Sequence, residues 1–172
     1  MKSRDIAVVG ILLAIGAILR FIANMFPGAI VGNPVIALYC LAIILIHPTV
    51  KEAFGIGIVA AIVSMMISHS IFPPANLVSE SLGAIVCMLL YSMLENKIAV
   101  APAITTFVAT CVSGFSFILV CMLVMLASII SIPTGTVMGF FAAVAPIVII
   151  TAVFNCIVTQ VLYFPAKRIL SR

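Results

Sequence analysis

Two ionisable side chains of opposite charge, Arg20 and Glu80, lie within long apolar stretches of this 172-residue chain. A charged side chain at the centre of a membrane helix costs about 2.5 to 3.5 kcal/mol on insertion scales, so such a residue usually has a function or a partner. A guanidinium binds a carboxylate through two hydrogen bonds, and a carboxylate binds an ammonium group. Together the two residues could bind a zwitterion, a molecule that carries both charges.

The same two residues also allow a purely structural interpretation. They could pair with each other, or Arg20 could reach the outer lipid headgroups while Glu80 stabilises the positive N-terminal end of its helix. The ligand-binding interpretation instead predicts an outward-facing pocket with further polar side chains and an apolar wall. The other candidate pocket residues are Asn33, Asn76, Ser79 and Thr136, with Phe26, Phe72 and Leu77 in the wall.

Other residue types that carry chemistry form no catalytic or metal-binding pattern in the sequence. The five cysteines form no C-x-x-C pair, and His47 and His69 have no carboxylate at ligand spacing. Phosphate-loop, G-x-S-x-G and H-E-x-x-H motifs do not occur. We therefore expect no enzyme, no cofactor and no metal, and any ATP-driven step must be powered by another chain.

Polar residues deeper in the apolar stretches are expected to serve packing. Serine and threonine commonly form hydrogen bonds to their own helix, which is our expectation for Ser113 and Ser116. Asn155 is the exception, for which we predict a hydrogen bond between helices.

The elements that must position these side chains are membrane-spanning helices. The sequence is 66% hydrophobic and 7% charged, and a helix needs about 20 apolar residues to cross a bilayer. The chain is therefore predicted to be an all-α membrane protein, with residues 1–172 forming a single transmembrane domain built as a bundle of six transmembrane helices. The second span is short and Pro146 predicts a kink in the sixth. The predicted spans are residues 6–26, 34–47, 53–69, 76–94, 102–132 and 137–163.

Lysine and arginine indicate the orientation, because positive residues are retained on the cytoplasmic side. With six spans, the basic residues at both ends of the chain, together with Lys51 and Lys97, fall on one side. This predicts cytoplasmic N and C termini in a multi-pass protein of the bacterial plasma membrane. The basic rim suits anionic lipid and gives no sign of a nucleic-acid partner. A cleaved signal peptide is the alternative for the N-terminus, but the first apolar run is long and has no A-x-A site.

Small residues line one face of the first span. Gly10, Ala14 and Ala17 are separated by four and three residues, so they share a helix face on which two backbones can approach closely. This face could pack within the bundle or could dock another membrane protein.

These features together resemble the substrate-binding (S) subunits of energy-coupling factor transporters, and among them the tryptophan-transporter type. The resemblance extends over nearly the whole chain, with its six spans and basic ends. It includes the first-helix sequence from Gly10 to Ala17, the turn at 26–28 and the Pro-Pro-Ala-Asn turn that ends at Asn76. That type leads us to expect a charged residue at the start of the second span, where this chain has Asn33-Pro34.

The resemblance implies a membrane subunit that captures a small molecule at its outer face, either tryptophan or another amino acid, or a vitamin. It implies a transmembrane coupling subunit and two ATPase subunits as partners, with Gly10, Ala14 and Ala17 facing the coupling subunit. The ligand would lie under the loop between the first two spans, at residues 26–34. The alternative is a ligand-free structural or assembly subunit of a larger membrane complex, in which Arg20 and Glu80 only join helices.

Overall fold

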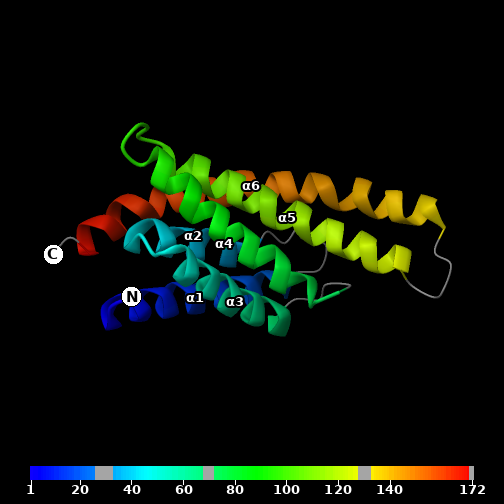
Figure 1. The fold of residues 1–172 in the computed structure, drawn as a ribbon, viewed down its shortest axis with the longest axis horizontal. Coiled ribbons are helices and arrows are strands. Elements are labelled where there is room, and N and C mark those ends of the chain that lie inside the picture. The colour runs from blue at the N-terminus through cyan, green and yellow to red at the C-terminus, as the bar shows by residue number, and fades with distance from the viewer. Residues whose placement is uncertain (26–32, 68–71, 128–132, 171–172) are drawn as a thin grey trace.

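The computed structural model describes residues 1–25, 33–67, 72–127 and 133–170. These residues form six α-helices and no strand (Figure 1). Five of the helices are long and apolar enough to cross a bilayer, and α2, with 13 residues, is shorter. The predicted helical membrane bundle is therefore confirmed. The helices are α1 (Ser3–Asn24), α2 (Pro34–Ile46), α3 (Val50–Ile67), α4 (Ala75–Leu94), α5 (Ala101–Ala127) and α6 (Thr134–Leu170).

The short helix α2 lies at the centre of the bundle and contacts all five other helices. Every side chain from Val35 to Ile44 is at most 3% exposed, as expected for a helix that is apolar on all sides. At about 1.5 Å per residue its length is roughly 20 Å, less than the roughly 30 Å of a hydrocarbon core. Protein surrounds it on every side, so α2 does not need to match the thickness of the lipid.

The other helices pack around α2 mostly in chain order. α3 to α6 contact one another in succession, α1 packs against α2 and α3, and α6 returns to α2. Both termini lie at the same end of the bundle, and α5 and α6 extend beyond the other helices at the opposite end (Figure 1). We call these the inner end and the outer end, following the predicted orientation.

Two glycines lie where the backbone of a neighbouring helix comes very close. A Cβ atom on Gly16 of α1 would lie 3.0 Å from the Cα atom of Val35 in α2. A Cβ atom on Gly57 of α3 would lie 2.7 Å from the Cα atom of Ser81 in α4. Both neighbours are backbone atoms that cannot rotate away, so glycine is required for this packing.

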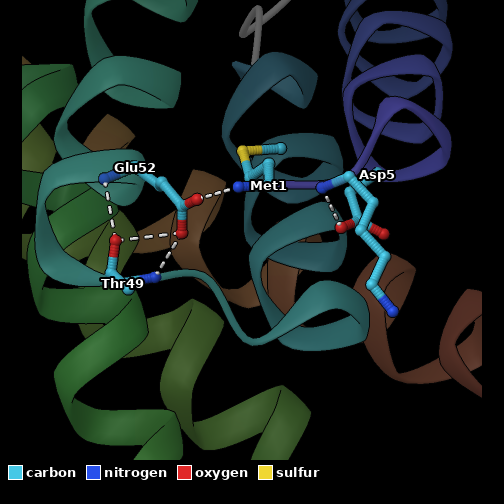
Figure 2. A network of polar contacts seen from close by, with 5 residues as sticks. Met1, Asp5, Thr49 and Glu52 are labelled. Atoms are coloured by element: carbon cyan, nitrogen blue, oxygen red, sulfur yellow. Dashed lines mark hydrogen bonds and ion pairs between the residues drawn. The ribbon is translucent and has the colours of Figure 1, made fainter.

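The inner ends of α1 and α3 are joined by polar contacts (Figure 2). Thr49 and Glu52 form a capping box at the start of α3: the Thr49 N–H donates to Glu52 Oε2 at 2.8 Å, and the Glu52 N–H donates to Thr49 Oγ1 at 3.4 Å. The amine of Met1 pairs with the same carboxylate. Asp5 accepts a hydrogen bond of 2.8 Å from the Lys2 N–H, which caps α1.

The helix boundaries differ from the predicted ones by up to three residues at the helix starts and by more at the end of α6. α6 runs from Thr134 to Leu170, seven residues past the predicted end at residue 163, and it continues through Pro146 and Pro165. Hydropathy marks where the apolar run stops, whereas the helix continues through the polar residues beyond it. α4 begins at Ala75, one residue before the predicted start, so Asn76 lies inside its first turn. The predicted ends at residues 26, 69 and 132 lie outside the described residues.

Candidate functional site

A cavity of about 180 Å³ lies between α1, α2, α4, α5 and α6. The residues that begin α2 and α4 line it, which places it toward the outer end of the bundle. Its α1, α2 and α4 side is mainly polar, and its α5 and α6 side is mainly apolar. Its polar lining consists of Arg20, Asn33, Asn76, Ser79, Glu80, Thr110, Ser113 and Thr151, and its other lining residues are Ile36, Gly114, Phe117, Val144, Ile147 and Val148.

Glu80 is the buried anion of this cavity, with 1% of its surface exposed. Its Oε1 atom accepts hydrogen bonds from Asn33 Nδ2 at 2.7 Å and from Ser64 Oγ at 3.4 Å. Its Oε2 atom accepts one from Ser113 Oγ at 3.2 Å. Three uncharged donors from three different parts of the bundle therefore hold the carboxylate in place.

Arg20 approaches the same carboxylate from α1, and a hydroxyl group lies between them. Its Nη1 atom donates to Ser64 Oγ at 2.9 Å, and Ser64 in turn donates to Glu80. Arg20 and Glu80 are both described, and the ion pairs of the described residues do not include a direct one between them. The two charges are therefore linked through Ser64.

Asn155 on α6 extends this network to the remaining helices. Its Nδ2 atom donates to the Asn33 backbone oxygen at 3.1 Å and to Thr110 Oγ1 at 3.3 Å. The predicted hydrogen bond between helices is therefore confirmed for Asn155. One connected network now includes a residue from, or capping, each of the six helices: Arg20 (α1), Asn33 (α2), Ser64 (α3), Glu80 (α4), Thr110 and Ser113 (α5) and Asn155 (α6).

The serine prediction was wrong for Ser113, whose hydroxyl donates to Glu80 and not to its own helix. Ser64 and Thr151 were also missed. The sequence held one signal for the α6 residues: Thr151, Asn155 and Thr159 are spaced by four and are all buried, so they form a polar stripe on one helix face. Ser64 had no such signal, because a lone serine in an apolar run is indistinguishable from packing.

The predicted pocket residues are only partly brought together. Arg20, Asn33, Asn76 and Glu80 line the cavity, and Asn76 also donates from Nδ2 to the Pro73 oxygen at 2.7 Å. The exposed Thr136 and half-buried Phe72 do not line it. Leu77 is exposed on α4, and Phe26 lies outside the described residues. The apolar wall comes instead from α5 and α6.

The small face of α1 does not pack inside the bundle. Gly10 and Ala14 are exposed and Ala17 is half-buried, and a Cβ atom on Gly10 would meet nothing within 4 Å. Gly16, on the adjacent face, makes the close contact with α2 instead. The surface formed by Gly10, Ala14 and Ala17 is therefore open along most of its length.

The inner end carries a second group of ionisable side chains. His47 Nε2 lies 2.6 Å from Glu95 Oε2, and their side chains are 53% and 28% exposed. Nearby, Lys167 Nζ donates to Tyr163 Oη at 2.9 Å, and Tyr163 lies 3.2 Å from Tyr91 Oη. Within the described part of the chain, no group of three or more His, Cys, Asp or Glu side chains is arranged to hold a metal ion.

The fold and the cavity define a multi-pass helical membrane protein with a buried polar site. The chain is similar to the probable tryptophan transport protein of Bacillus subtilis (strain 168), with 27% identity over 176 residues that cover 100% of this chain and 95% of that protein. This similarity confirms the resemblance to the tryptophan-transporter type that the sequence predicted. No protein-family model matches the chain, and no solved structure matches it.

Proposed function

We propose that this chain is the substrate-binding membrane subunit of an ATP-driven importer of the energy-coupling factor type. It captures tryptophan or a related amino acid from the outer side of the membrane. The observation that carries this proposal is that a buried carboxylate, Glu80, and a guanidinium, Arg20, line the same cavity. The similarity to a protein named for tryptophan transport supports the choice of ligand.

Charge balance favours a zwitterion over an ion. Arg20 and Glu80 together bring no net charge into the cavity, and a zwitterion adds none. A carboxylate has about four acceptor sites, and three hydrogen bonds of Glu80 are already made by Asn33, Ser64 and Ser113. Glu80 lines the cavity, where its carboxylate can accept a charge-assisted hydrogen bond from the ammonium group of an amino acid.

The carboxylate of the ligand would bind on the side of Arg20. A guanidinium has five N–H donors in a planar arrangement, and among the described residues Ser64 is the acceptor that it contacts. Asn33 and Asn76, at the first turns of α2 and α4, also line the cavity. The N-terminal end of a helix carries partial positive charge and attracts anions, which adds to the attraction for a carboxylate.

The volume of the cavity supports a ligand of amino-acid size. Sites for drug-sized ligands are usually about 300 to 1,000 Å³, whereas this cavity measures about 180 Å³. A larger vitamin would require the helices to move apart. Ligand screening of the purified protein with amino acids and vitamins decides between these classes.

The test of the site uses Glu80→Gln and Arg20→Gln, which remove charge and keep a hydrogen-bonding side chain. Each variant should weaken tryptophan binding by about 2 to 5 kcal/mol, the usual scale for breaking a buried charge pair, and its melting temperature without ligand shows whether it is folded. Glu95→Gln removes an exposed acid at the inner end and serves as the control. Isothermal titration in detergent measures the affinities.

Two outcomes would contradict the proposal. Unchanged affinity in either single variant removes that residue from the site. If the wild-type chain binds no amino acid or vitamin, and the double variant recovers stability lost in the single variants, the ligand-free assembly subunit is the correct interpretation.

The surface formed by Gly10, Ala14 and Ala17 is the proposed docking face for the transmembrane coupling subunit, which would bring two ATPase subunits. Ala14→Leu should leave ligand binding intact and abolish transport, because added bulk prevents close approach of two helices. Ala143→Leu, at an equally exposed small residue of α6, is the matched control. If Ala14→Leu still transports and co-purifies with the coupling complex, the docking face lies elsewhere.

A further inference from the structure

The α5 and α6 side of the cavity is mainly apolar, with three hydroxyl groups from Thr110, Ser113 and Thr151. Phe117, Val144, Ile147 and Val148 provide the apolar surface. The two helices are close here, because a Cβ atom on Gly114 would lie 2.5 Å from Val148 Cγ1. Thr110 and Ser113 on α5 donate to acceptors within the protein, which leaves Thr151, one turn after Ile147 on α6.

Thr151 is 7% exposed, and within the described part of the chain its hydroxyl has no hydrogen-bond partner. Its neighbours differ: Thr110 donates to the Thr106 oxygen at 2.8 Å, and Thr159 donates to the Ala37 oxygen at 3.1 Å. A hydroxyl that faces a cavity without a partner favours a ligand group that can form a hydrogen bond with it. The hydroxyls of Thr105 and Thr106 also lack partners, but these two residues do not line the cavity.

We propose that the Thr151 hydroxyl accepts a hydrogen bond from a polar N–H group on the side chain of the ligand. This inference rests on the proposed function and makes it more specific. Arg20 and Glu80 bind the charged groups that all amino acids share, whereas the α5 and α6 wall binds the side chain. A mainly apolar wall in which one hydroxyl group is without a partner suits an aromatic ring that carries a single N–H donor, such as an indole.

The hydroxyl can accept this bond without leaving its own hydrogen unpaired. A threonine inside a helix can donate to the carbonyl four residues earlier, which for Thr151 is that of Ile147. An aromatic ring without a donor would leave the oxygen atom of the hydroxyl group without a hydrogen bond to accept. The site should therefore prefer an indole to a ring of the same shape that has no N–H group.

The test compares L-tryptophan with 3-benzothienyl-L-alanine, in which sulfur replaces the ring N–H. Affinities are measured for the full-length wild-type protein, Thr151→Val and Thr151→Ser in detergent. Wild type and Thr151→Ser should bind tryptophan about tenfold more tightly than the analogue, which is the usual effect of one hydrogen bond on affinity. Thr151→Val should lose this preference by binding tryptophan more weakly, while its affinity for the analogue is unchanged or higher.

The outcomes separate this inference from the proposed function. If Thr151→Val retains the wild-type preference, or if the wild type binds both ligands equally, Thr151 does not contact the ring and this inference is wrong while the binding function stands. If the wild type binds neither ligand, the tryptophan-binding function fails as well. The affinity of Thr151→Val for the analogue reports whether the variant is folded.

Discussion

The outer cavity and the inner end of the bundle both carry acidic and basic side chains, but they hold them in different ways. At the outer cavity, Glu80 is 1% exposed and uncharged donors contact both of its oxygens. At the inner end, the His47 and Glu95 side chains are in direct contact and are 53% and 28% exposed. The exposed side chains contact each other directly, whereas the buried Arg20 and Glu80 are linked through the hydroxyl group of Ser64.

Solvent exposure, more than distance, therefore decides how much a polar contact contributes to the free energy of unfolding. Water screens an exposed pair and replaces its hydrogen bonds when it breaks, so such a pair contributes about 0 to 1 kcal/mol. A buried donor that loses its acceptor has no such replacement. The shorter contact at the inner end is therefore expected to matter less than the longer contacts around Glu80.

The largest effect is expected for Glu80→Ala. This change removes the acceptor of three buried donors and leaves Arg20 without its nearby opposite charge, so the free energy of unfolding should fall by about 3 kcal/mol or more. Glu95→Ala, at the inner end, should lower it by less than about 1 kcal/mol. Equilibrium unfolding in mixed detergent micelles measures both. Equal losses in the two variants would remove the distinction between the two regions.

The next effect concerns the helix contact that positions Glu80. Gly57→Ala should destabilise the protein by about 1 to 3 kcal/mol, because the new methyl group meets the α4 backbone. Gly55→Ala, on the open side of the same helix, should be neutral or stabilising by up to about 1 kcal/mol. Melting temperatures of the two variants provide the comparison. A neutral Gly57→Ala would mean that α3 and α4 can separate without cost.

Asn155→Leu should cost about 1 kcal/mol, since hydrogen bonds between membrane helices contribute modestly. Its second effect is on ligand binding, because Asn155 donates to the backbone of Asn33, whose side chain contacts Glu80. Tryptophan affinity should fall even though Asn155 does not line the cavity. Unchanged affinity in a destabilised variant would show that the network holds helices together without positioning the site.

The smallest effect is expected at the exposed pair. His47→Ala should change the free energy of unfolding by less than about 1 kcal/mol, and the change should shrink further at high ionic strength, where exposed charges are screened. Unfolding at low and high salt measures this. A large loss that does not depend on salt would indicate that the inner end is as protected from solvent as the cavity.

Hydropathy and charge predicted the helical membrane bundle because lipid imposes long apolar helices on any sequence that crosses it. They also identified Arg20 and Glu80, because charged residues in apolar runs are conspicuous. The contacts between them were not predictable, since Ser64 and Ser113 resemble ordinary packing residues in sequence. The apolar wall of the cavity was assigned to Phe72 and Leu77, near the first turn of α4, but it comes from α5 and α6. Which apolar residue faces a cavity depends on how each helix is rotated about its axis. A stretch that is apolar on all sides has no polar face from which this rotation can be predicted.

Because α2 lies at the centre of the bundle, it can be fully packed only after the later helices have been synthesised and inserted. A 13-residue apolar helix is too short to remain stably across a bilayer by itself. Its final contacts include α6, which is synthesised after the other five described helices. Until α6 is inserted, one flank of α2 must be covered by lipid, by a chaperone or by the translocation channel. Chains that are truncated before α6 should therefore be degraded rapidly, even though they retain five of the six helices and both charged residues of the cavity.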